Sequence, residues 1–288
     1  MNEKVLILSD QKPGHLNQSI AFCKLKKLNY DIIDLNTSKK FNKTISYILD
    51  FFSIYINLFN IKIENTQYKA VISTGSFTYY ANKYVSKKLK IKSVAIMLPK
   101  GFRYSDFNYI LAQQHDIRES GDNIIVMPLN LSINSPKGYL KKNNNKSVGI
   151  ILGGNNKLFT MTAEEIKKVL DEIYNKYPNH LKYITTSRRT PESIDKLLEK
   201  YEFDYEIVYS KISTINPIPD FINVCDELYI SIDSTSMLSE AKANSQAPIH
   251  IIDLESKKNN TKYHKLANNV KNIKGKLDYH QYLNKVNI

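Results

Sequence analysis

The stretch KVLILSDQKPGHLNQS, residues 4–19, joins a short apolar run to a Pro-Gly turn and a polar segment that leads into a helix. A buried strand followed by a turn and a helix is the building unit of a parallel α/β sheet. Such units recur along nearly the whole chain, which implies right-handed crossovers and sheets covered on both faces. The expected strands are 4–8, 30–34, 70–73, 92–97, 109–112 and 124–127, then 148–152, 183–186, 206–208, 227–230 and 249–252; the expected helices include 17–28, 77–88, 163–177, 191–201 and 236–243.

Residues 136–146, PKGYLKKNNNK, separate the two series of strands and have the composition of a linker. We therefore predict an α/β protein of two Rossmann-like domains, residues 1–140 and 147–288, with parallel sheets facing across a cleft. Ligands of such sheets bind at the carboxyl ends of the strands, so the loops after each strand are the places to search for a site.

The 288 residues carry 41 Lys and Arg against 28 Asp and Glu, a net charge of +13. Residues 1–146 hold +12 of this excess and residues 147–288 hold +1. This asymmetry indicates that the first half meets something anionic, such as acidic lipid headgroups or a phosphorylated substrate. Nucleic acid is not expected as a partner, because the lysines are dispersed and no nucleic-acid-binding motif is present.

Several features suggest a cytoplasmic protein. Cys23 and Cys225 match no metal-ligand spacing and are expected to be buried, reduced thiols. The first residues turn polar too early for a signal peptide. Segment 45–63 is apolar, but five polar residues interrupt it, so a spanning helix is not expected. Its apolar residues fall on both helix faces, which fits either burial between layers or an interfacial helix on the inner face of a membrane.

The loop after the first strand gathers a carboxylate, an ammonium, an imidazole and two amides around a Pro-Gly turn. We expect Asp10 or His15 to take a proton from an attacking hydroxyl, while Lys12 holds an anionic group. Asn17 is the expected cap of the following helix, and an ordinary capped turn is the competing interpretation. The full set of predicted acceptor-binding residues is Lys12, Gly14, Asn17, Gln18, Gly75, Arg103 and His115.

Three loops of the second series suggest an anion site. Gly153 and Gly154 follow a buried strand and could form an amide nest around phosphate oxygens. In SRRTP, Thr190 is the expected helix cap, and two adjacent arginines in a lysine-rich chain favour bidentate phosphate or carboxylate binding. The segment DSTS, residues 233–236, stands at the expected start of a helix, where its hydroxyls could cap the helix or donate to a pyrophosphate. Glu240, about one turn later, could accept from ribose hydroxyls.

The predicted donor-binding residues are Gly153, Gly154, Asn155, Ser187, Arg188, Arg189, Asp233, Ser234, Ser236, Met237 and Glu240. Neither a G-x-G-x-x-G fingerprint nor a P-loop is present. No metal-binding motif is present either, so neither a catalytic metal nor another cofactor is expected.

The motifs SDQKPGHLNQS (9–19), LGGNN (152–156), ITTSRRTP (184–191) and DSTSMLSEA (233–241) occur in an order that resembles the mitochondrial-fission "elongated mitochondria" family and its bacterial relatives. Bacterial members are assigned as GT-B-type glycosyltransferases, sometimes as nucleoside-diphosphate-sugar epimerases. The resemblance spans about residues 6–252 and implies two Rossmann-like domains, with the donor nucleotide on the second and the acceptor on the first. Residues 245–248, SQAP, depart from the Gly-Lys-Pro turn that is usual in relatives.

Residues and resemblance together predict a metal-independent glycosyltransferase that moves a sugar from a nucleotide sugar to a cell-surface glycan or a lipid-linked anionic acceptor. Direct attack of the acceptor hydroxyl would invert the configuration at the anomeric carbon of the sugar. Two alternatives stay open. A nucleotide-sugar epimerase would use the donor site without an acceptor, and a non-catalytic membrane-associated scaffold would bind no nucleotide.

Overall fold

A computed structural model describes residues 4–36, 40–64, 67–117 and 121–288. The chain divides into two compact units, residues 1–132 with 278–288 and residues 133–277. The expected linker belongs to the second unit, where Asp220 accepts hydrogen bonds from the backbone N–H groups of Lys137 and Gly138. Counted by these units, the net charges are +8 and +5. Much of the charge asymmetry therefore disappears, because four lysines of the linker lie in the second unit.

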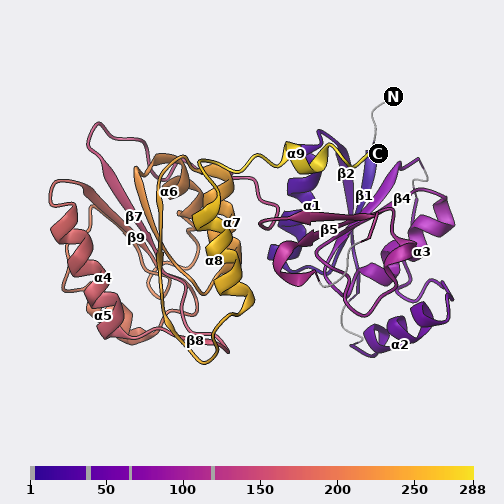
Figure 1. Cartoon of the computed structure of the whole chain (residues 1–288), viewed down its shortest axis with the longest axis horizontal. Coiled ribbons are helices and arrows are strands. Elements are labelled where there is room, and N and C mark those ends of the chain that lie inside the picture. Colours follow the sequence, from indigo (N-terminus) through magenta and orange to yellow (C-terminus); the bar gives the residue numbers. More distant parts are fainter. Residues whose placement is uncertain (1–3, 37–39, 65–66, 118–120) are drawn as a thin grey trace. The chain divides into compact units, whose positions relative to one another are not determined.

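The first unit is built on a six-stranded sheet in the order β2-β1-β3-β4-β5-β6, with every neighbouring pair parallel. Helix α1 covers one face, and α3, with α2 outside it, covers the other (Figure 1). Strands β1 and β3 to β5 are apolar and almost fully buried, as expected for a parallel sheet between helical layers. Its elements are β1 (Lys4–Ser9), α1 (Pro13–Leu25), β2 (Asn29–Asp34), α2 (Lys40–Phe51), β3 (Ala70–Thr74), α3 (Tyr79–Leu89), β4 (Lys92–Ile96), η1 (Tyr104–Asp106), β5 (Tyr109–Gln113), η2 (Gln114–Asp116), β6 (Ile124–Met127) and α9 (His280–Leu283).

The end of the chain returns to this unit. Lys26 Nζ donates to the carbonyl of Val286 at 2.9 Å, and Lys92 Nζ donates to that of Asn287 at 2.8 Å. The hydroxyl of Tyr279 donates to the carbonyl of Asn130. The last eleven residues therefore belong to the first unit, although the sequence placed them with the second.

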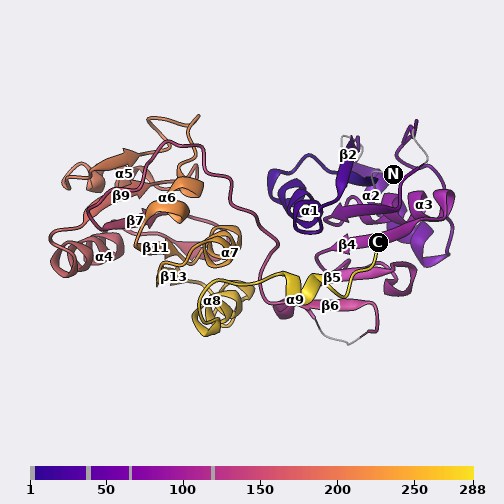
Figure 2. The ribbon, with the colours of Figure 1, turned by 90° about the horizontal axis from the view of Figure 1, so that it is seen from above.

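The second unit is built on a five-stranded parallel sheet in the order β10-β9-β7-β11-β12. Helices α4 and α5 lie on one face, and α6, α7 and α8 lie on the other (Figures 1 and 2). A short antiparallel pair, β8 with β13, was not predicted. The elements are β7 (Ser147–Ile151), β8 (Phe159–Thr160), α4 (Ala163–Lys176), β9 (Leu181–Thr185), α5 (Glu192–Leu198), β10 (Tyr205–Ile207), α6 (Ile218–Val224), β11 (Glu227–Ser231), α7 (Thr235–Asn244), β12 (Ile249–Ile252), β13 (Glu255–Ser256) and α8 (Lys262–Asn272).

Both cysteines are buried and unpaired among the described residues, as predicted. Burial raises the pKa of the Cys23 thiol to about 12, and it raises that of Cys225 to about 12 as well. Within the described ranges, no helix is both long enough and apolar enough to cross a membrane.

Candidate functional sites at two switch points

The strand order of each sheet contains one switch point. At this point successive strands stop being added on one side of the first strand and are added on its other side. In the first unit this point lies between β1 and β3, and in the second between β7 and β11. The loops that leave these four strands contain Asp10, Gly75, Gly153 and Asp233. Eight of the twenty predicted site residues lie on these four loops, where open α/β sheets bind ligands, and the others lie in α1 and α7 or after other strands.

In the first unit, Asp10 and His15 form a hydrogen-bonded pair. Nδ1 of His15 lies 3.0 Å from both carboxylate oxygens of Asp10. Asp10 also accepts from the backbone N–H of Lys12 at 3.3 Å and from its ammonium at 3.0 Å. The Asp10 side chain is 1% exposed and that of His15 is 25% exposed. A buried carboxylate thus holds an imidazole that reaches solvent.

Two opposing effects set the charge of Asp10. Burial tends to raise its pKa, but the hydrogen bonds from His15 and Lys12 outweigh burial and leave the pKa below its usual value. Asp10 is therefore ionised at neutral pH and accepts the proton that His15 carries on Nδ1. This leaves Nε2 as the basic nitrogen, and no described residue hydrogen-bonds to it.

Gly75 provides the space that the His15 ring occupies. A Cβ atom at Gly75 would lie 2.3 Å from Nδ1 and 2.4 Å from Cε1 of His15, far inside van der Waals contact. The backbone at Gly75 has a φ of 94°, which side chains rarely adopt. The glycine, predicted to contact the acceptor, therefore makes room for the imidazole of His15.

Helix α1 begins four residues earlier than predicted. Lys12 is its N-cap and Pro13 its first residue, a position that suits proline. Asn17 is therefore an exposed residue inside the helix and caps nothing, so that prediction is wrong. Gly14 lies in the first turn with open space around it. Gln18 is buried and donates to the Gly14 carbonyl at 3.2 Å, while its Oε1 accepts nothing from the described residues.

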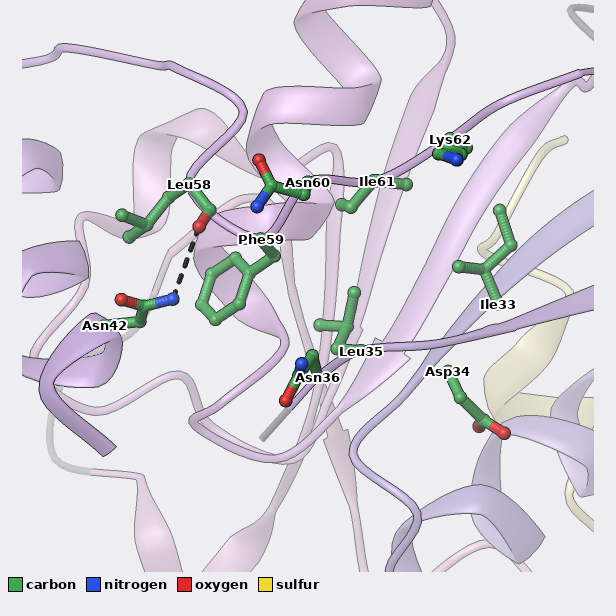
Figure 3. Close-up of a pocket in the computed structure, with 10 residues that line it drawn as sticks. All are labelled: Ile33, Asp34, Leu35, Asn36, Asn42, Leu58, Phe59, Asn60, Ile61 and Lys62. Atoms are coloured by element: carbon green, nitrogen blue, oxygen red, sulfur yellow. Dashed lines mark hydrogen bonds between the residues drawn. The ribbon is translucent and has the colours of Figure 1, made fainter. Parts of the chain in front are cut away.

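A hollow of about 400 Å³ opens at the carboxyl end of β2 (Figure 3). The Leu35 N–H donates to the Ser9 carbonyl at 2.8 Å, so the rim of the hollow adjoins the end of β1 and Asp10. Amide side chains line it from three segments, and Asn42 donates to the Leu58 carbonyl at 3.3 Å. The lining residues are Ile33, Asp34, Leu35, Asn36, Asn42, Leu58, Phe59, Asn60, Ile61 and Lys62.

Arg103 belongs to a charged network that fixes α2 and α3. Its guanidinium donates to Asp106 at 2.7 Å and to Tyr55 at 2.8 Å. Behind it, the fully buried Lys83 lies 2.6 Å from Asp50 and 3.4 Å from Asp106. These contacts hold the Arg103 guanidinium against the fold, while 37% of its side chain stays exposed.

His115, another predicted acceptor residue, lies in η2. Its side chain is 6% exposed, and its Nε2 is 3.9 Å from a carboxylate oxygen of Asp116. That carboxylate binds Lys100 at 2.5 Å. Little of the imidazole therefore reaches solvent.

In the second unit, Asp233 holds three loops together. Its side chain is fully buried, and one carboxylate oxygen accepts from Arg189 at 2.6 Å and from the Gly154 N–H at 3.1 Å. The other accepts from the hydroxyl of Ser231 at 2.6 Å. A Cβ atom at Gly153 would lie 2.3 Å from this carboxylate. The loops after β7, β9 and β11 are therefore locked to one another.

The Gly-Gly loop is not a free amide nest, so that prediction is wrong. The N–H of Gly153 donates to Ser231 at 2.7 Å, that of Gly154 to Asp233, and that of Asn155 to the carbonyl of Arg189 at 3.0 Å. At Gly154 a Cβ atom would lie 2.1 Å from that carbonyl oxygen. Both glycines are required because the neighbouring loops approach their backbone closely.

The two adjacent arginines have different environments. Arg189 binds Asp233 and lies within 3.4 Å of the carbonyls of Gly154 and Asn155. Arg188 is exposed, and no described residue accepts a hydrogen bond from it. Of the pair, Arg188 has the guanidinium that is available to a ligand.

The loop that holds these arginines is tied down by its hydroxyls. Ser187 and Thr190 both donate to the carbonyl of Gly153. The predicted cap at Thr190 is wrong, because α5 begins at Glu192 with Pro191 in the N-cap position. Thr190 instead accepts from the Ser187 N–H at 2.9 Å, which closes the turn.

Helix α7 starts at the second switch point. Ser234 caps it by accepting from the Met237 N–H at 3.3 Å, while Ser236 is exposed. Glu240 follows one turn later with no hydrogen bond to its carboxylate from the described residues. Burial raises the pKa of Glu240 to about 7. Strongly shifted pKa values are common at functional sites, so Glu240, one turn into α7, is a candidate site residue.

No group of three or more His, Cys, Asp or Glu side chains among the described residues is placed to hold a metal ion.

Residues 13–276 match the family described as mitochondrial fission ELM1. The chain belongs to the mitochondrial fission ELM1 family. The match covers both switch-point loop clusters except Asp10 and Lys12, which lie just before it. A search of curated proteins gives no match.

Solved structures show the same α/β fold at low sequence identity. A Listeria monocytogenes protein, provisionally named a UDP-N-acetylglucosamine 2-epimerase, has a TM-score of 0.56 and 9% identity over 94% of this chain and 82% of its own. The kitacinnamycin glycotransferase has a TM-score of 0.56 and 11% identity over 96% and 87%. Arabidopsis thaliana UGT89C1, complexed with UDP-L-rhamnose, has a TM-score of 0.50 and 10% identity over 93% and 88%. The chain therefore has the fold of GT-B glycosyltransferases and related epimerases.

Sequence reasoning missed the amides that line the hollow, Asn36, Asn42 and Asn60. Asparagine is abundant throughout this chain, so no local pattern distinguishes these three. They meet only because the segments before, within and after α2 converge.

The Gly75–His15 contact can be tested with two glycines of the same site. We expect Gly75→Ala to lower the free energy of unfolding by about 1–3 kcal/mol and to displace the imidazole, because the new methyl group overlaps the ring at a positive φ. Gly14→Ala should be neutral or stabilising by up to about 1 kcal/mol, because it adds a methyl group to open space in a helix. Urea unfolding measures both; equal effects would contradict this interpretation.

Glu240 makes stability depend on pH. Its pKa is about 7 in the fold and 4.5 ordinarily, so the folded state holds the proton more tightly. The contribution of Glu240 to the free energy of unfolding is largest below pH 4.5. It falls by up to about 3 kcal/mol as the pH rises through 7. Glu240→Gln should therefore be more stable than the wild type above pH 7 and equal to it below 4.5, while the exposed Glu202→Gln should change neither. Thermal unfolding across this range decides; parallel curves for wild type and Glu240→Gln would refute the assignment.

Proposed function

We propose that the protein is a glycosyltransferase that moves a sugar from a nucleotide sugar to an acceptor hydroxyl. The donor would bind the second unit at Arg188 and α7, and the acceptor would bind the first unit beside His15. The observation that carries the proposal is the Asp10–His15 pair, with a buried carboxylate on Nδ1 and no described partner on Nε2. The fold shared with the kitacinnamycin glycotransferase supports it.

In the proposed reaction His15 is the general base. Its Nε2 takes the proton of the acceptor hydroxyl while that oxygen attacks the anomeric carbon. The bond between this carbon and the phosphate oxygen breaks, and the nucleoside diphosphate leaves with the electron pair. Asp10 stabilises the imidazolium that forms, because its ionised carboxylate lies 3.0 Å from Nδ1. Direct attack inverts the configuration of the sugar.

On the donor side, Arg188 supplies a guanidinium for the diphosphate. The exposed Ser236 lies in the first turn of α7, where the helix dipole favours an anion. Together they would stabilise the leaving group without a resident metal or other cofactor. Glu240 would accept from the ribose hydroxyls, which suits a carboxylate that lacks a protein partner.

The acceptor is proposed to be a glycan of the cell surface or a lipid-linked anionic molecule. The hollow beside β1 offers several amide groups, which suit a polyhydroxylated ligand, and Lys62 offers a cation. A lipid-linked acceptor would place the enzyme at the inner face of a membrane as a peripheral protein.

The two arginines give a matched test of the donor site. Arg188→Ala should weaken the binding of nucleotide sugars at least about tenfold and leave the unfolding free energy within about 0.5 kcal/mol of the wild type. Arg189→Ala should instead lower the unfolding free energy by about 3 kcal/mol, because it leaves the buried Asp233 carboxylate without its cation. Titration calorimetry and urea unfolding measure the two effects. Unchanged binding by Arg188→Ala would contradict the donor site.

Turnover tests the catalytic pair. We expect nucleotide release from a nucleotide sugar in the presence of acceptor extracts, falling about 10²- to 10⁴-fold in His15→Ala. Asp10→Asn should also lower it strongly, because the amide no longer stabilises the imidazolium. Full activity in both variants would refute the mechanism. Conversion of the nucleotide sugar without transfer would identify an epimerase, and no nucleotide binding at all would favour a scaffold.

A further inference from the structure

The α2 surface is an exposed apolar face formed by α2 and the residues that follow it. Phe41, Ile48 and Phe52 are spaced along one stripe of the helix, which the hydrogen bond from Phe52 N–H to the Ile48 carbonyl continues. Phe51 packs edge-on against Phe52 with ring centroids 5.1 Å apart. The side chains of this surface are 47–74% exposed, and they are Phe41, Ile48, Phe51, Phe52, Ile54 and Ile56.

The opposite face of α2 is anchored, so these side chains cannot turn into the core. Asp50, 1% exposed, binds the ammonium of the buried Lys83 on α3 at 2.6 Å. The same carboxylate accepts from the Arg103 N–H at 2.9 Å, which ties α2 to the loop after β4. Breaking a buried ion pair to rotate the helix would be costly. The polar network therefore holds the apolar side chains outward.

The surroundings of this surface are cationic. Between residues 40 and 63 the sole acidic residue is Asp50, and it is buried. Lys87 lies 4.7 Å from the Tyr55 ring centroid and is half-exposed, and Arg103 donates to Ser53. Because Lys83 and Asp50 are a buried pair, the exposed cations of the linked cluster are Lys87 and Arg103, against the one carboxylate of Asp106. An apolar surface bordered by excess positive charge complements an anionic one.

We propose that the α2 surface docks on an anionic lipid bilayer. Its phenylalanine and isoleucine side chains would enter the boundary between headgroups and acyl chains, while the neighbouring cations meet lipid phosphates. The helix has twelve residues, enough to lie in the interface. This docking deepens the proposed function and rests on it only for the identity of the acceptor, which would then be presented by the same bilayer.

Vesicle flotation of the full chain tests the proposal. The vesicles contain equal parts of phosphatidylcholine and phosphatidylglycerol, with pure phosphatidylcholine as the comparison. We expect binding to the anionic vesicles at low salt that weakens with added salt. The variant with Phe51→Ser and Phe52→Ser should bind at least about tenfold more weakly, because it loses two large apolar side chains. Ile212→Ser removes an exposed isoleucine of the second unit and should bind like the wild type.

Three results would overturn the proposal. In the first, the wild type does not bind vesicles at all. In the second, the double phenylalanine variant binds as tightly as the wild type, and in the third the wild type binds neutral and anionic vesicles equally. A dimer that dissociates in that variant, with no vesicle binding, would assign the surface to a second copy of the chain. Nucleotide binding by the variant should match the wild type, so a failure of the donor site is seen separately.

Discussion

A carboxylate that is buried at the end of a parallel strand must be compensated by cations or hydrogen-bond donors, and this constraint organises both units. In the first unit Asp10 is compensated by His15 and Lys12, and in the second Asp233 is compensated by Arg189 and the Gly154 N–H. Each carboxylate draws its loop tightly onto a neighbouring one. The close approach leaves no room for side chains beyond glycine at the adjacent positions.

The same constraint separates residues that support a site from residues that can meet a ligand. Arg189 forms an ion pair with the buried Asp233, whereas Arg188 beside it is exposed. Asp10 engages Nδ1 of His15, which leaves Nε2 as the basic nitrogen. Rigid loops with one reactive group directed outward are what catalysis requires, because the geometry is set before the substrate binds. In our proposal the diphosphate and the acceptor hydroxyl meet these two groups.

The sequence predicted the two parallel sheets well, because fully buried strands appear as short apolar runs between helices. It also singled out Asp10, His15 and the three loops of the second unit as candidates, because ligands of parallel sheets bind at the loops that follow the strands. It did not predict the uses of these residues. The glycine amides resembled an anion nest, but their partners, Ser231 and Asp233, come from about 80 residues later in the chain. Asn17 resembled a cap, although Pro13 already begins the helix. The return of residues 278–288 to the first unit depends on tertiary hydrogen bonds that leave no local pattern.

We propose that a nucleotide sugar binds at the second switch point, and hydrogen–deuterium exchange of the full chain tests this binding most directly. With a saturating nucleotide sugar, we predict slower exchange in the loop around Arg188 and in the first turns of α7, from Thr235 to Glu240. The nucleoside diphosphate alone should protect the same amides. Unchanged exchange in both segments, with protection elsewhere or nowhere, would contradict the account.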